Sequence, residues 1–369
     1  MSEKVYLFAN RCRAALMRRF RYKNVRSIAL IALLLILLIG ASGIIGILSL
    51  AKQGAATPST TGQVMFFDNP SELPGHSDSL SVVIHGLNVP PSGYYYAAWL
   101  INDAKEEVVP LGTLSGANGT YTLNYKASDT NLLSAGQMIK ITLEQGIDRL
   151  PIGKVMLIGT FPPKSSTHIG HMLISFPGTP GQIGVLVGVL QQTRMLNIQA
   201  DVLQSVEASH DTMAIRCVAQ NIIDVIEGKQ GPHYQPLAPT CAQHDVIAAS
   251  DGFGLLGQGY LTDSGEHATL AISQPDATDM MRLHAQLLIT VLTDVKGWVT
   301  TIEQDALHLL NNPSDVTAVQ DVVRLADAAY HGVDTNGDGQ IDPISGEGGA
   351  LTAYRQGQLM TTLLLTANT

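Results

Sequence analysis

Oxygen-bearing side chains recur at alternate positions in one short segment near the end of the 369-residue chain. The segment DTNGDGQIDP, residues 334–343, offers five oxygen ligands at this spacing: the side chains of Asp334, Asn336, Asp338 and Asp342 and the backbone carbonyl of Gln340. Such spacing lets successive ligands point inward around one hard cation, and Gly339 permits the sharp turn that the loop needs. The pattern therefore predicts a metal site built from oxygen atoms.

This stretch, residues 334–347, resembles the calcium loop of EF-hand proteins and is likewise flanked by predicted helices. In that family the twelfth loop position carries a bidentate Glu, whereas this chain has Ser345 there and Glu347 two residues later. Pro343 and Gly346 could bend the chain so that Glu347 supplies the carboxylate. The resemblance implies calcium as the cofactor. The alternative is a solvated acidic turn that uses Asn and Gly only for its backbone geometry.

Histidines are the second set of candidate ligands. His168 and His171 are three residues apart, and four more lie in or beside predicted helices: His210, His284, His308 and His331. Closely spaced histidines can share one metal ion, and helical bundles build such sites between facing helices. Haem or transition-metal binding by bundle histidines is therefore an alternative function. Half-exposed surface histidines are the other interpretation.

Motifs for catalysis are missing from the sequence. It contains no GxSxG elbow, no P-loop and no GxGxxG after a strand. Carboxylate pairs such as Asp263 and Glu266 are too close in sequence to indicate general acid/base chemistry. We therefore expect that the protein is not an enzyme.

Helical patterns dominate residues 163–369 and predict an antiparallel bundle. They cover 180–206, 211–227, 277–311, 315–331 and 349–367. One apolar stripe is expected along the longest of them: Leu283, Leu287, Val291, Val295, Trp298 and Ile302. Residues 163–179 are predicted as a connector with one strand at 171–176. Residues 228–275 are predicted as a long irregular segment that is either functional or packed over the bundle.

Residues 63–162 contain short runs rich in Val, Ile, Tyr and Thr, which are typical of strands. There are seven of them, at 64–67, 80–87, 94–101, 107–114, 119–125, 138–145 and 153–161. The Asn118–Gly119 pair is a strong signal for a hairpin turn. Seven short strands with this spacing predict an antiparallel β-sandwich.

The strand region also carries a family resemblance. YYYAAWLIND, PLGTLS, GTYTLNY, MIKITLEQG and PIGKVMLIGTF follow one another as in the exported C-terminal domain of anti-sigma-K factors. The resemblance covers about residues 62–162 and implies a sandwich that follows a single membrane span. A transmembrane regulator is therefore another alternative function. Residues 1–26 are too few for the full cytoplasmic sigma-binding domain of that family.

Residues 27–51 contain no charged side chain. A membrane-spanning helix needs about 20 such residues. Eight Lys and Arg against one Glu in residues 1–26 predict a cytoplasmic N-terminus. We expect a single-pass plasma-membrane anchor, a linker over 52–62 and an extracytoplasmic bulk. A cleaved signal peptide is the rival interpretation.

Charge and cysteine content limit the partners and the redox state. The net charge is −9 although the N-terminal segment is basic, so the remainder is acidic, which argues against nucleic acid. The expected partners are the lipid bilayer and proteins at the cell surface. Cys217 and Cys241 either form a disulfide or remain buried thiols.

The sequence as a whole predicts a single-pass anchor followed by an α+β exported part, an antiparallel β-sandwich and then an α-helical bundle over residues 163–369. The expected function is extracytoplasmic binding or scaffolding with a structural calcium site.

Overall fold

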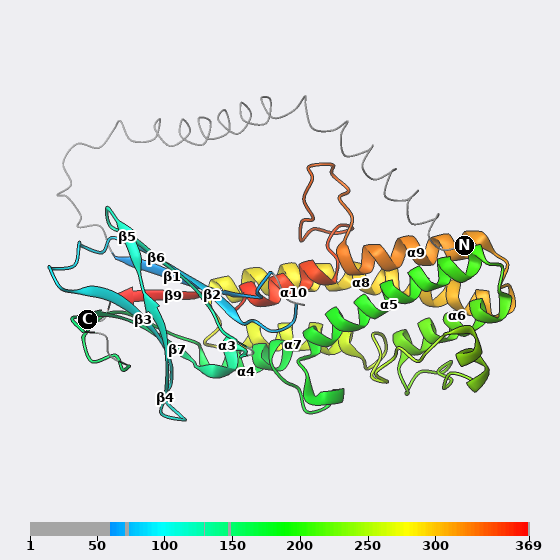
Figure 1. Ribbon diagram of the computed structural model, residues 1–369, viewed down its shortest axis with the longest axis horizontal. Coiled ribbons are helices and arrows are strands. Elements are labelled where there is room, and N and C mark those ends of the chain that lie inside the picture. Colours follow the sequence, from blue (N-terminus) through cyan, green and yellow to red (C-terminus); the bar gives the residue numbers. More distant parts are fainter. Residues whose placement is uncertain (1–59, 71–73, 129, 147–148, 368–369) are drawn as a thin grey trace, which may run out of the picture. The chain divides into compact units, whose positions relative to one another are not determined.

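A single antiparallel sheet of nine strands receives its central strand from the C-terminal part of the chain (Figure 1). The computed structural model describes residues 60–70, 74–128, 130–146 and 149–367. Within them the strand order is β4-β3-β7-β8-β9-β1-β2-β6-β5. The strands are β1 (Thr61–Phe67), β2 (Ser79–His85), β3 (Tyr95–Asn102), β4 (Glu107–Thr113), β5 (Ser115–Ala117), β6 (Thr120–Lys126), β7 (Met138–Glu144), β8 (Lys154–Thr160) and β9 (Leu363–Ala367).

Strands occur at all seven positions that the sequence predicts. Asn118 and Gly119 have positive φ angles of 54° and 83° and form the turn between β5 and β6. The predicted sandwich is wrong, however. β9 pairs with β8 on one side and with β1 on the other, so the two groups of strands form one continuous sheet.

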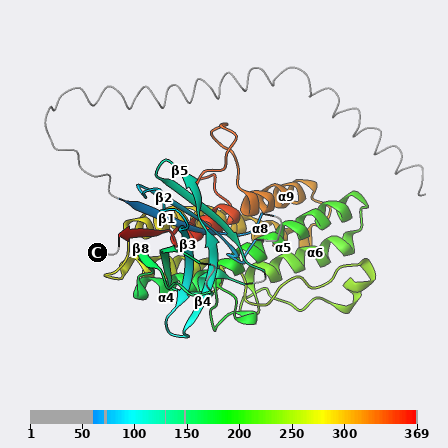
Figure 2. The same cartoon turned by 60° about the vertical axis from the view of Figure 1, so that its left-hand side comes forward.

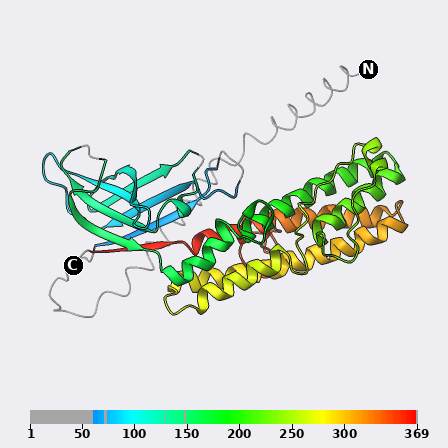
Figure 3. The same ribbon diagram turned by 90° about the horizontal axis from the view of Figure 1, so that it is seen from below.

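β9, the red strand in Figure 3, runs from the bundle into the sheet. Two glycines leave room for it there. A Cβ atom added at Gly159 would lie 2.8 Å from Cδ2 of Leu365, and one at Gly62 would lie 3.0 Å from the Cβ of Leu365. Leu363 and Leu365 are buried, whereas Leu364 between them is 60% exposed. The predicted helix over 349–367 is therefore wrong in its last part, where the alternating LLLTA segment forms a strand.

Apart from α3, which lies between β6 and β7, the helices lie between β8 and β9 in sequence. They are α3 (Leu132–Ala135), α4 (Pro163–Leu173), the 3₁₀ turn η1 (Pro180–Gln182), α5 (Val185–Ala208), α6 (Thr212–Glu227), the 3₁₀ turn η2 (Pro239–His244), α7 (Tyr260–Ser273), α8 (Asp279–Asn311), α9 (Val316–His331) and α10 (Ala350–Leu359). The strand predicted at 171–176 is wrong, because α4 occupies most of that connector. α7 lies inside the segment predicted to be irregular.

α8 packs against α6, α7, α9 and α10 and contributes the longest buried face of the bundle. Its buried apolar residues recur every three or four positions: Met281, Ala285, Leu288, Val291, Leu292, Val295, Val299 and Ile302. The predicted stripe matches this face at Val291, Val295 and Ile302, whereas Leu283 is 49% exposed. The buried face is therefore rotated from the predicted one in the first turns of α8.

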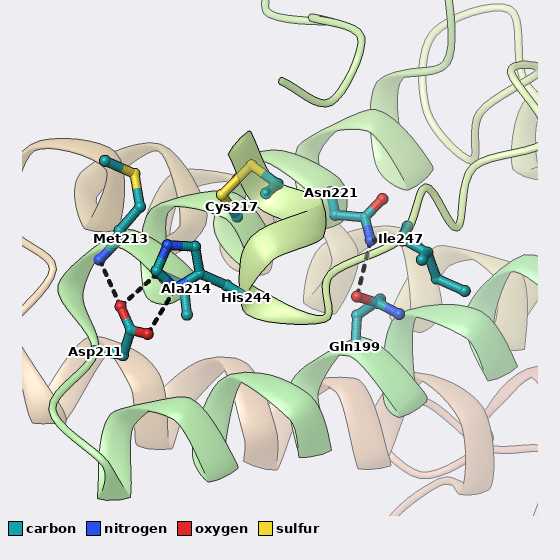
Figure 4. The surroundings of a disulfide bond; sticks show 9 residues. Gln199, Asp211, Met213, Ala214, Cys217, Asn221, His244 and Ile247 are labelled. Carbon is teal, nitrogen blue, oxygen red and sulfur yellow. Dashed lines mark hydrogen bonds and ion pairs between the residues drawn. A yellow bond between two sulfur atoms is a disulfide. The ribbon is translucent and has the colours of Figure 1, made fainter. Parts of the chain in front are cut away.

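A disulfide holds the long segment after α6 against the bundle (Figure 4). Cys217 on α6 and Cys241 in η2 form a disulfide. The sequence had left open whether these two cysteines are bonded or are buried thiols. Nδ1 of His244 lies 2.7 Å from an Asp211 carboxylate oxygen. Asn221 donates to the carbonyl of Ile247 at 2.8 Å. The segment therefore packs over α6 through three separate attachments.

One carboxylate connects the loop between β1 and β2 to α10. Asp68 accepts hydrogen bonds from the backbone N–H groups of Gly75 (2.7 Å) and Ser77 (2.6 Å). It also accepts from the Tyr354 hydroxyl (3.1 Å) and the Gln358 amide (2.9 Å) on α10. Burial and the negative charge of Asp68 raise the pKa of Tyr354, so its hydroxyl keeps its proton and remains a donor.

The predicted membrane anchor is not upheld. Among the helices that the structure describes, none combines the length and the apolar character needed to cross a bilayer. α8 is long enough at 33 residues, but charged side chains such as Asp294, Lys296 and Glu303 interrupt it. The predicted span at 27–51 and the tail at 1–26 lie outside the described residues. The single-pass fold and the plasma-membrane location inferred from that span are corrected accordingly.

The two leucines of β9 give a matched test of this topology. Leu365→Ala should lower the free energy of unfolding by about 2–5 kcal/mol, because it opens a cavity where β8, β9 and β1 meet. Leu364→Ala should change it by less than about 0.5 kcal/mol, since that side chain is exposed. Urea unfolding of both variants measures the difference. Equal losses would contradict the placement of β9 at the centre of the sheet.

Candidate metal centre

The predicted metal loop lies between α9 and α10 and projects from the bundle (Figures 1 and 2). An isolated β-bridge between Gly332 and Gly348 closes its base, and the N–H of Val333 donates to the carbonyl of Glu347 at 2.8 Å. Gly332 follows the last residue of α9 with a φ of 93°, a conformation that glycine adopts without strain. The bridge therefore returns the chain to its starting point and brings Glu347 back to the first ligand.

Three carboxylates converge inside this loop. Oxygen atoms of Asp334, Asp338 and Glu347 lie within 4.8 Å of one another. Glu347 is fully buried, whereas the two aspartates are exposed. In the part of the chain that the structure describes, none of the three forms an ion pair with Lys or Arg. The loop therefore concentrates negative charge without a basic side chain to balance it.

The buried carboxylate of Glu347 has only long hydrogen bonds. Its oxygens accept from Thr335 Oγ1 at 3.3 Å, from Asn336 Nδ2 at 3.5 Å and from the N–H of Asp342 at 3.4 Å. Ordinary hydrogen bonds to carboxylates are shorter, at about 2.7–2.9 Å. A buried, charged carboxylate needs short hydrogen bonds or a counter-charge, and these three long contacts do not provide them.

Backbone amides hold the exposed ligands in place. Asp334 accepts from the N–H groups of Gly337 (2.6 Å) and Gly339 (2.9 Å). Asp338 accepts from the N–H of Gln340 at 2.8 Å. Gly337 and Gly339 have φ angles of 77° and 85°, so glycine at the sixth loop position has the conformation that the sequence led us to expect.

The other predicted ligands differ in their placement. Asn336 contacts Glu347 through its amide, and Asp342 contacts it through its backbone. Gln340 is exposed and contributes its N–H to Asp338. Ser345, at the twelfth position, bonds instead to Asp294 of α8 at 3.4 Å. Ser345 therefore turns toward the bundle, and the carboxylate that closes the loop is Glu347.

A second cluster, which the sequence did not indicate, surrounds Glu227 at the end of α6. One oxygen of Glu227 lies 2.6 Å from Nδ1 of His233, and the other accepts from the His233 N–H at 2.6 Å. Glu303 of α8 shares a hydrogen bond with Glu227. These three side chains also have ligand atoms within 4.8 Å of one another, so they could hold a cation. Glu227 and Glu303 line a cavity of about 740 Å³ together with Lys229 and Phe253.

Glu303 holds a proton up to near neutral pH. Burial, the hydrogen bond to Glu227 and the charge of Glu227 raise the pKa of Glu303 to about 7, and His233 opposes this shift. Below that pH, protonated Glu303 can therefore donate a hydrogen bond to the Glu227 carboxylate. Glu303 is distant in sequence from Glu227 and His233, and the three residues match no motif, so spacing could not reveal them.

Of the predicted histidine ligands, only His168 and His171 lie together; the other four lie apart from them. His284 bonds to Gln356, His308 to Asp315 and His331 to Asp327, and each of these has its own polar partner. His210 is exposed in the turn before α6. His168 and His171 lie on α4 and meet His267 of α7, which the sequence reading did not select.

Comparisons with known proteins do not place this chain in a family. No family model matches it, and neither the curated proteins nor the solved structures contain a match. The resemblances to anti-sigma-K factors and to EF-hands rest on the residues quoted for them alone.

The raised pKa of Glu303 predicts a pH dependence of stability. Because the folded pKa of Glu303 lies above its ordinary value of 4.5, the folded state binds more protons than the unfolded state between about pH 4.5 and 7. Stability should therefore fall as pH rises through this interval. Glu303→Gln removes this dependence and should stabilise the protein more at pH 8 than at pH 5, relative to wild type.

Urea unfolding across this pH range measures the effect of Glu303→Gln. Asp201→Asn, which neutralises an exposed carboxylate on α5, is the control and should leave the profile parallel to that of wild type. A Glu303→Gln profile parallel to wild type would contradict the raised pKa.

Proposed function

We propose that this protein binds calcium in the loop between α9 and α10 and acts as a binding or scaffolding protein in which the ion orders that loop. The observation that supports the proposal is the buried carboxylate of Glu347, whose oxygens lie within 4.8 Å of those of Asp334 and Asp338. Three carboxylates this close repel one another unless a cation balances them.

The ligand set favours calcium over other divalent ions. All candidate ligands are oxygens, which suit hard cations, whereas transition metals prefer nitrogen and sulfur. Calcium accepts six to eight oxygens in flexible geometry, and magnesium demands a near-ideal octahedron. Asp334 and Asp338 are exposed, so water has access to the remaining coordination positions. An irregular, partly open loop of this kind is therefore better suited to calcium.

The position of the loop supports a structural role for the ion. Residues 348 and 349 lead directly into α10, and α10 bonds to Asp68 and continues into β9. The N–H of Gly346 donates to Asp294 of α8 at 2.8 Å, so the loop is also attached to the bundle. Calcium at Glu347 would therefore fix the start of the segment that joins the bundle to the sheet.

The test is a substitution whose effect on stability changes sign with calcium. Glu347→Gln removes a buried charge, so without calcium it should melt at a higher temperature than wild type. With calcium at about 100 times its Kd, wild type should gain about 2.7 kcal/mol, and the variant should gain little. Calorimetric titration and thermal melting of both proteins measure these effects.

The control is Asp327→Asn, which removes an exposed carboxylate on α9 outside the loop. It should bind calcium as wild type does. Wild type that shows neither binding heat nor a melting shift would contradict the calcium site. An equal response to magnesium would contradict the choice of calcium.

A further inference from the structure

Three histidine rings from two helices meet at one point of the bundle. His168 and His171 lie one turn apart on α4, and His267 lies on α7, which packs against α4. The ring centroids are 4.8 Å apart for His171 and His267, 5.7 Å for His168 and His267, and 6.2 Å for His168 and His171. All three rings are half-buried. Because two helices contribute, any ion bound among the rings would connect α4 to α7.

One pair of ring nitrogens has the separation found around a tetrahedral metal ion. One nitrogen from each ring lies within 4.8 Å of the other two, and Nδ1 of His168 is 3.4 Å from Nδ1 of His267. Zinc–nitrogen bonds of about 2.0–2.1 Å at tetrahedral angles separate two ligand nitrogens by about 3.4 Å. His168 and His267 therefore already have the nitrogen separation that zinc requires, and a nitrogen of His171 lies within 4.8 Å of a nitrogen of each.

One ring nitrogen in the cluster has no partner. Nδ1 of His171 is buried and makes no hydrogen bond. The Phe176 ring packs on His171 and His267, at centroid distances of 5.4 and 5.1 Å, and keeps that side of the cluster apolar. Burial and the neighbouring histidines lower the pKa of His267 to about 4, and burial and His168 lower that of His171. Both rings are therefore neutral at neutral pH, the state in which imidazole binds metals.

A metal-free arrangement explains only part of this geometry. The amide of Gln274 lies 3.4 Å from Nε2 of His168, and an N–H···N hydrogen bond could join His168 to His267. That network accounts for His168 and His267. It leaves the Nδ1 of His171 buried and unsatisfied, which is uncommon for a polar atom inside a protein. An ion bound by all three rings through the Nδ1 of His171 would give that atom a partner.

We propose that His168, His171 and His267 bind one divalent transition-metal ion, with zinc as the best match. Three imidazole nitrogens suit zinc, copper, nickel or cobalt and exclude calcium and magnesium as preferred ions. Three protein ligands leave one tetrahedral position for water or an external donor. This site is independent of the calcium loop, because the two share no residue.

The ion would strengthen an attachment that already exists at the start of α4. Asp276, just after α7, accepts from the N–H of Lys164 at 2.8 Å and from the Ser165 hydroxyl at 2.7 Å. His168 and His171 lie one and two turns further along α4. The carboxylate and the metal would therefore hold α4 against the α7 region at two successive levels.

Cobalt(II) and zinc titrations of the full chain test the proposal, with excess calcium present to occupy the acidic loop. Cobalt should give the visible absorption of a tetrahedral site, and zinc should displace it. Replacing any one of the three histidines with alanine (His168→Ala, His171→Ala or His267→Ala) should weaken zinc binding by more than about 100-fold. Loss of a residue that only orients a metal ligand weakens binding by at most about 100-fold, so a larger loss identifies a direct ligand. Far-UV circular dichroism confirms that each variant is folded.

Two controls separate coordination from packing. Phe176→Leu disturbs the ring cluster but keeps all three nitrogens, so it should retain the cobalt spectrum. His233→Ala removes the histidine of the Glu227 cluster and should also retain it. A spectrum lost in His233→Ala but kept in the three histidine variants would overturn the proposal. So would a wild-type protein that binds neither metal, in which case the three rings form only a packed, hydrogen-bonded cluster.

Discussion

The insertion of β9 between β8 and β1 is the constraint on which the rest of the structure depends. Without this strand, β8 and β1 would each present an open edge, and unpaired edges associate readily with other chains. Gly159 and Gly62 provide the space, and Leu363 and Leu365 fill the core there. The bonds from α10 to Asp68 add a second attachment close to the same point. The segment of α10 and β9 is therefore part of both the bundle and the sheet.

The two proposed metal sites lie on the segments of the bundle that follow β8 and precede β9 in the chain. β8 leads into α4, which carries two of the three clustered histidines. The acidic loop leads into α10 and then into β9, and β9 pairs with β8. Each proposed ion would therefore bind a part of the bundle that is close in sequence to one of these two adjacent strands. This arrangement supports structural rather than chemical roles for both ions.

Local sequence patterns predicted those features of the fold that depend on neighbouring residues, such as strands and turns. Alternation and the Asn118–Gly119 turn located the strands, and oxygen spacing located the loop with Glu347 as a candidate closing ligand. Long-range pairing was not predictable, because LLLTA fits a helix end as well as a strand until its partners are known. α7 lacks a continuous apolar stripe, so His267 went unnoticed, and Glu227 and Glu303 meet only in the folded chain. The apolar run at 27–51 indicated an anchor, and no described helix supports one.

The position of β9 also affects how the protein is made. Val64 in β1 pairs with Leu363, so nearly the whole described length of chain must leave the ribosome before the sheet can close. Until residue 367 has been synthesised, the nascent chain carries a gap between β8 and β1. Such gaps expose backbone donors and acceptors, and contacts between distant segments form slowly. Closure of the sheet therefore waits for β9, the last of the described strands, and depends on contacts between segments that are distant in sequence.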